Sequence, residues 1–142
     1  MLTKPVNGRC EFSLFDFEVQ ISCVEDIPVD WLKTCKYGLE GRLPVSFSLL
    51  DNGYEYVMLS IDGYGLFIVD VIDENRKLFQ HDFSLVEFTE ELLKDIEMNL
   101  DEWANWYPAK ILGGPDAGRR EVLVNLLAYT KEALASYVIN KP

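Results

Sequence analysis

The chain contains a single histidine, His81, which is the first candidate for chemistry. A cysteine beside an imidazole makes a nucleophile and its base, and Asp82, next to His81, would be the carboxylate of such a triad. No cysteine is near it in the sequence, however, and neighbouring residues of a strand point to opposite faces. We therefore interpret His81 as a structural histidine that shares the core face of its strand with Phe79 and Phe83.

Asp70 is the second candidate, because it interrupts the apolar run from Leu66 to Ile72. A carboxylate held among apolar side chains has a raised pKa, which suits a general acid or base near neutral pH. The simpler interpretation places Asp70 at the wet margin of a half-covered sheet face. A small enzyme or ligand-binding domain with a pocket near Asp70 and His81 is retained as an alternative function.

The three cysteines are Cys10, Cys23 and Cys35, an odd number whose spacings match no CxxC pair. Such a pattern is typical of reduced, structural thiols. A zinc site takes about four ligands, and His81 with three scattered cysteines is a poor match for one. We predict no metal and no cofactor.

The stretch from Gly113 to Arg120 is rich in glycine, contains two arginines and opens a predicted helix. Amide and guanidinium groups at a helix start can hold an anion. The stretch is not a P-loop, because the lysine and hydroxyl that should follow the last glycine are absent. Asp116 occupies the place of a phosphate, so a capped helix start is the preferred interpretation.

The most pronounced feature is acid concentrated on one predicted helix, residues 84–107, which begins with the capping box of Ser84 and Glu87. Between residues 84 and 103, seven acidic residues accompany one lysine, Lys94, which gives a net charge of −6 out of −11 for the chain. A solvated helix face is the simpler interpretation. Soluble helices commonly alternate acid and base at i and i+4, however, and this one places like charges together. A basic protein docked here would relieve their repulsion.

Aromatic residues follow the acid at the end of this helix. Trp103, Trp106 and Tyr107 lie at i, i+3 and i+4, and such side chains are enriched in binding hot spots. Trp103 falls on the predicted core stripe, whereas Trp106 is expected to be exposed. The predicted partner-binding residues are Glu87, Glu90, Glu91, Glu97, Asp101, Glu102 and Trp106.

Composition limits the class of protein and of partner. The chain has 142 residues, of which 49% are hydrophobic and 26% charged, as expected for a single globular domain, residues 1–142. The net charge of −11 argues against nucleic acid and anionic membrane, because phosphate binding needs clustered lysine and arginine. No apolar run approaches the roughly 20 residues that span a bilayer, and the first residues lack a signal pattern. We expect a cytoplasmic protein.

The strands are predicted from short apolar runs that alternate with turn signals. Four of them form an antiparallel meander over residues 44–83, with a tight hairpin turn at residues 51–53. A half-solvated strand is predicted at residues 15–23. The apolar alternation changes face between Leu14 and Phe15, which predicts a bulge or a tight turn there.

The helices are predicted at residues 29–37, 84–107 and 116–139. The last is apolar around most of its circumference, which is typical of a helix wedged between two layers or buried in an oligomer contact. The predicted fold class is α+β: one antiparallel sheet of five to six strands, made of the meander and the N-terminal strand, packed by two long C-terminal helices and one short helix.

In size, acidity and lack of a catalytic motif the chain is similar in type to the immunity proteins of bacterial toxin and immunity pairs. That similarity implies a non-catalytic inhibitor that covers a basic partner, such as a nuclease toxin, with its acidic face. The alternatives are the small enzyme or ligand-binding domain described above, and a structural subunit that forms a homodimer or larger oligomer through the final helix.

Overall fold

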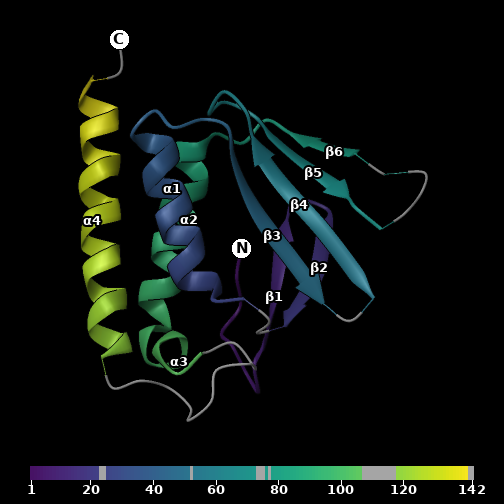
Figure 1. The fold of residues 1–142 in the computed structure, drawn as a ribbon, viewed down its shortest axis with the longest axis horizontal. Coiled ribbons are helices and arrows are strands. Elements are labelled where there is room, and N and C mark those ends of the chain that lie inside the picture. The colour runs from purple at the N-terminus through teal and green to yellow at the C-terminus, as the bar shows by residue number, and fades with distance from the viewer. Residues whose placement is uncertain (23–24, 52, 73–75, 77, 107–117, 141–142) are drawn as a thin grey trace.

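The computed structural model describes residues 1–22, 25–51, 53–72, 76, 78–106 and 118–140. The chain has an α+β fold with one two-stranded and one four-stranded antiparallel sheet and with helices packed beside them (Figure 1). In chain order the elements are β1 (Arg9–Leu14), β2 (Phe17–Ser22), α1 (Ile27–Leu39), β3 (Val45–Asp51), β4 (Tyr54–Ser60), β5 (Leu66–Asp70), β6 (Leu78–His81), α2 (Leu85–Met98), α3 (Leu100–Ala104) and α4 (Arg119–Asn140).

The predicted meander is confirmed as the four-stranded sheet, in the order β3-β4-β5-β6. Asp51 pairs with Tyr54 at the end of the β3–β4 hairpin, and Gly53 in the turn has a φ of +80°. A side chain is strained in that left-handed conformation, which explains the glycine. Phe47 and Leu49 of β3 are buried and mark the sheet face that the helices cover.

The prediction of five to six strands in one sheet is not met, because β1 and β2 pair with each other as a separate sheet. The predicted change of face is a tight turn: Leu14 pairs with Phe17, and Phe15 between them has a φ of +56° and is exposed. β2 contacts β3 through side chains, for example the bond from Ser22 Oγ to Leu50 O at 3.3 Å. The alternation of apolar and polar residues identified β2 as a strand, but it did not show that β2 pairs with β1.

Helices α1 and α2 form a middle layer between the four-stranded sheet and α4 (Figure 1). Three aromatic rings join this layer to the sheet. The ring centroid of Phe47 on β3 lies 4.6 Å from that of Phe88 on α2 and 5.6 Å from that of Trp31 on α1. All three side chains are buried, so this cluster is the centre of the core.

The short predicted helix is confirmed as α1, which extends two residues beyond the predicted range of 29–37 at each end. Pro28 lies in its first turn, where a missing amide hydrogen costs nothing. Gly38 is buried against α2, and a Cβ atom there would come within 2.5 Å of Leu85 Cδ2. Glycine therefore allows the close approach of α1 and α2.

The predicted helix over residues 84–107 is divided at Asn99, whose φ of −123° and ψ of 42° are not helical, so that α2 ends there and α3 follows. The serine half of the predicted capping box is confirmed at its start, whereas the Glu87 carboxylate bonds the Ser84 hydroxyl and not the Ser84 amide. Glu87 N donates to Ser84 Oγ at 3.1 Å, and the Ser84 hydroxyl donates to the Glu87 carboxylate at 3.3 Å. The predicted stop at Tyr107 and Pro108 lies outside the described residues.

α4 is the outer layer of the molecule, and the first of its two predicted positions, between two layers, is wrong. Leu123, Leu127 and Thr130 are its buried residues. Val138 and Ile139, by contrast, are 54% and 79% exposed. Its apolar side chains surround the helix, but only one side finds a packing partner in the described fold. Burial in an oligomer contact stays a prediction.

Candidate functional site

α2 is amphipathic: one side is buried in the core, and the opposite, exposed side carries acidic residues. Leu85 and Phe88 lie in the core, and the helical repeat turns Glu87, Glu90 and Glu91 to solvent. These three carboxylates are named the α2 acidic surface. Within the described part of the chain neither Glu90 nor Glu91 forms an ion pair, and Glu87 contacts only the capping serine.

Two of the predicted binding carboxylates are paired with cations of α4. Lys131 forms an ion pair with Glu97, and Arg120 forms one with Asp101. All four side chains are at least 41% exposed, so each pair contributes little to stability. The pairs nevertheless compensate the acid on the side of α2 and α3 that faces α4.

Two further acids face the N-terminal segment. Lys4 Nζ lies 3.9 Å from Glu102 Oε1. Asp95 Oδ2 accepts a hydrogen bond from Leu2 N at 2.8 Å and lies 3.4 Å from the amino group of Met1. The Asp95 side chain is only 8% exposed. The acidic residues of α2 and α3 are therefore not all turned unpaired to solvent, and the α2 acidic surface is the part without an ion pair among the described residues.

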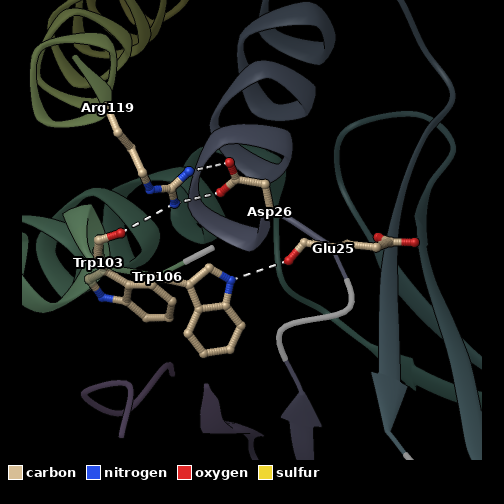
Figure 2. A network of polar contacts seen from close by, with 5 residues as sticks. All are labelled: Glu25, Asp26, Trp103, Trp106 and Arg119. Atoms are coloured by element: carbon tan, nitrogen blue, oxygen red, sulfur yellow. Dashed lines mark hydrogen bonds and ion pairs between the residues drawn. The ribbon is translucent and has the colours of Figure 1, made fainter. Parts of the chain in front are cut away.

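Trp106 is buried, and the prediction that it is exposed is wrong. Its indole Nε1 donates to the backbone oxygen of Glu25 at 3.2 Å, as Figure 2 shows. Its ring centroid lies 5.3 Å from that of Trp103. Because the helix breaks at Asn99, the helical repeat of α2 does not extend to Trp106. This side chain closes the core and is not available to a partner.

The two arginines of the glycine-rich stretch before α4, Arg119 and Arg120, are paired with carboxylates. Arg119 Nη2 donates to Asp26 Oδ1 at 2.7 Å, its Nη1 donates to the other oxygen, and Nη2 also donates to Trp103 O at 3.2 Å (Figure 2). Arg120 is ion-paired as well. Residues 113–117 lie outside the described residues. The arginines serve to attach the start of α4 to the layer beneath it.

Asp70 and His81 lie at opposite ends of β5. Asp70 is its last residue, and its carboxylate accepts from Ile72 N at 3.1 Å. His81 pairs with Leu66, the first residue of β5, and its ring stacks on Phe15 at a centroid distance of 4.9 Å. Four strand residues separate the two positions by roughly 13 Å, too far for both to act on one reacting atom.

The cysteine thiols that the structure describes are buried and not reactive. Burial raises the pKa of Cys10 and of Cys35 to about 12, so both are protonated at neutral pH. Cys23 lies outside the described residues. Among those that are described, no group of three or more histidine, cysteine or acidic residues is arranged to hold a metal ion.

α4 is, by length and composition alone, long and apolar enough to cross a membrane, which qualifies the prediction that no segment approaches that length. Lys131 and Glu132 lie in its interior, however, and a charge at the centre of a bilayer costs about 3 kcal/mol. Lys131 is moreover ion-paired with Glu97 of α2. We therefore keep the prediction that the partner is not a membrane.

The structure contains a cleft of about 620 Å³ that sequence reasoning missed. It lies between the end of α1, the turn that joins β4 to β5, and the C-terminal half of α4, and its lining includes Tyr64, Tyr129, Tyr137 and Glu132. These segments are far apart in the sequence. The one available signal was the spacing of Tyr129 and Tyr137, eight residues apart on one helix face.

The geometry thus offers an acidic surface on α2 and an aromatic cleft beside α4. Comparisons of the chain with protein-family models, with curated proteins and with solved structures found no match.

Proposed function

We propose that the chain is a non-catalytic binding protein that covers and inhibits a basic protein partner through the α2 acidic surface, Glu87, Glu90 and Glu91. This places it with the immunity proteins of toxin and immunity pairs in type of action. A nuclease toxin is a suitable partner, because an active site that binds phosphates is itself basic. The proposal requires no cofactor and no metal.

The observation that carries the proposal is the unequal compensation of the acid on α2 and α3. On the side that faces α4, Lys131 and Arg120 pair with Glu97 and Asp101. On the α2 acidic surface, Lys94 is the one nearby cation of the helix, and the described residues give it no ion pair. Like charges three and four residues apart destabilise a helix by about 0.2–0.5 kcal/mol each, a cost that a cationic partner would remove.

The test is capture from extracts of the native host with two double variants of equal charge change. Glu90→Lys with Glu91→Lys reverses the α2 acidic surface. Glu11→Lys with Glu18→Lys reverses two exposed carboxylates of the β1–β2 hairpin. These pairs avoid Glu97 and Asp101, whose reversal would set two lysines against the cations of α4 and disturb its packing.

The wild-type chain and the hairpin variant should retain the same basic protein, released as salt rises, and the α2 variant should lose it. Equal retention by all three chains would overturn the proposal. Circular dichroism and thermal unfolding of each variant show whether a loss reflects binding or the fold.

A second candidate is a homo-oligomeric structural subunit, favoured by the exposed apolar side chains of α4. Val122, Tyr129, Val138 and Ile139 are each at least 49% exposed. An apolar helix face of this kind is covered in many oligomers. Light scattering at micromolar concentration tests this: a mass of twice 16.3 kDa or more supports it, and a monomer mass excludes it at that concentration.

A further inference from the structure

The cleft beside α4 has walls that are held in place by the fold. Asp62 Oδ1 accepts from Tyr64 N at 2.9 Å and from Gly65 N at 3.4 Å, which fixes the turn that presents Tyr64. Gly63 O in the same turn accepts from Leu85 N at 2.9 Å, at the start of α2. The wall opposite α4 is therefore attached to the middle helical layer and is preorganised.

The aromatic content of the cleft comes from both sides. Tyr64 and Tyr129 are 60% and 52% exposed, so both side chains reach the surface where they line the cleft. Tyr137 is half-buried, and its hydroxyl lies 3.9 Å from the position that a Cβ of Gly63 would occupy. α4 thus leans against the β4–β5 turn through Tyr137, with the other two rings at the opening.

The described residues that line the cleft carry a net negative charge. Lys36 and Glu40 line one side and form an ion pair with each other, so they cancel. Glu132 is exposed on the other side, and within the described residues it has no ion-pair partner. A carboxylate beside tyrosine rings attracts an organic cation, because the ring faces are negative as well.

We propose that this cleft binds an arginine or lysine side chain of an extended basic segment of a protein partner, with Glu132 as the counter-charge and Tyr129 and Tyr64 as the aromatic walls. A volume of about 620 Å³ accommodates such a side chain together with flanking backbone. The chain itself shows the contact that we expect, since the Arg42 guanidinium lies 5.2 Å from the ring centroid of Tyr37.

The cleft is a second site and not part of the α2 acidic surface. α4 reaches α2 through Lys131, whose partner is Glu97, whereas the cleft opens between α4 and α1. The α2 acidic surface lies on α2 alone and the cleft between α1, the β4–β5 turn and α4, so the two share no residue and can be tested separately.

The probe is a hexa-arginine peptide, titrated into the full chain by calorimetry and by two-dimensional NMR of the tyrosine rings. Glu132→Gln removes the counter-charge of the cleft. Glu121→Gln is the matched control, because it removes the same charge from the same helix at an exposed position that does not line the cleft. We expect Glu132→Gln to weaken binding at least fivefold and Glu121→Gln less than twofold, with ring signals of Tyr64 and Tyr129 shifting on binding.

Equal weakening by the two variants, or ring signals that do not shift, would overturn the cleft as the site. A third variant, Glu90→Gln with Glu91→Gln, separates the two proposals. If it alone weakens binding, the peptide occupies the α2 acidic surface and the cleft proposal fails. If Glu132→Gln alone weakens binding, the cleft proposal stands whatever becomes of the α2 acidic surface.

Discussion

α2 and α4 are the two long helices of the molecule, and they are stabilised in different ways. Seven residues of α2 are buried, and its remaining side is acidic. Three residues of α4 are buried, although it is the longer helix and its apolar side chains are spread around its circumference. The difference follows from position, because α2 lies in the middle layer between sheet and helix and α4 lies outside it (Figure 1). The apolar content of a helix does not by itself set its burial.

α4 buries few residues, and ion pairs with the helical layer beneath it add to its attachment. Arg119 attaches its start to Asp26, and Lys131 attaches its middle to Glu97. Because these cations come from α4, the position of α4 also decides which carboxylates of α2 remain for a partner. The ion pairs of α4 thus leave Glu87, Glu90 and Glu91 as the unpaired carboxylates on which the proposed binding surface depends.

The largest expected effect is on the free energy of unfolding, and it compares one buried side chain of α2 with one of α4. Phe88→Ala should lower the free energy of unfolding by about 3–5 kcal/mol, because it empties the aromatic cluster with Trp31 and Phe47. Leu127→Ala on α4 should cost about 2–3 kcal/mol, since an outer helix can settle toward the cavity. Urea unfolding measures both. A larger loss for Leu127→Ala would contradict the layer assignment.

The next effect concerns two adjacent arginines. Arg119→Gln should lower the free energy of unfolding by about 2–3 kcal/mol. This is less than for a fully buried ion pair, because the Asp26 side chain is 21% exposed. Arg120→Gln should cost less than about 1 kcal/mol, because its pair with Asp101 is exposed. Thermal unfolding at equal salt compares the two variants. Equal costs would show that Arg119 does not anchor α4.

The smallest effect concerns Glu25, the carboxylate next to the Asp26 that pairs with Arg119. Burial, followed by the nearby carboxylates of Asp30 and Glu55, raises the pKa of Glu25. A carboxyl whose pKa is raised on folding stabilises the fold while it is protonated, and this contribution is lost as pH rises from its unfolded pKa, about 4.3, through its folded pKa.

Glu25→Gln removes the unfavourable negative charge that Glu25 carries in the fold at neutral pH. The variant should be more stable than wild type at pH 7, by less than about 0.5 kcal/mol because the side chain is only half-buried, and the difference should vanish below about pH 4. Urea midpoints of both chains across this range give the measurement. A variant that is less stable than wild type at pH 7 would contradict the statement that the fold disfavours an ionised Glu25.

The sequence allowed the local features of the fold to be predicted. The meander was evident from alternation and turn residues, and the cap at Ser84 from its spacing to Glu87. The turn at Phe15 followed from the change of face after Leu14. Each of these depends on residues close together in the chain.

Features that depend on distant residues were not predictable from periodicity. The pairing of Glu97 with Lys131 and the burial of Asp95 against Leu2 depend on where whole elements dock. Trp106 was misplaced because a helical repeat cannot show the break at Asn99. Of the carboxylates predicted to bind a partner, the structure leaves Glu87, Glu90 and Glu91 exposed and without ion pairs among the described residues, and the cleft was not predicted at all.

The most direct test of the central claim is carbodiimide labelling of exposed carboxylates, with and without the basic protein that the wild-type chain retains from its host. We predict that Glu90 and Glu91 lose labelling in the complex while Glu11 and Glu18 of the β1–β2 hairpin keep it. Unchanged labelling of Glu90 and Glu91, with protection elsewhere on the molecule, would contradict the assignment of the α2 acidic surface as the binding site.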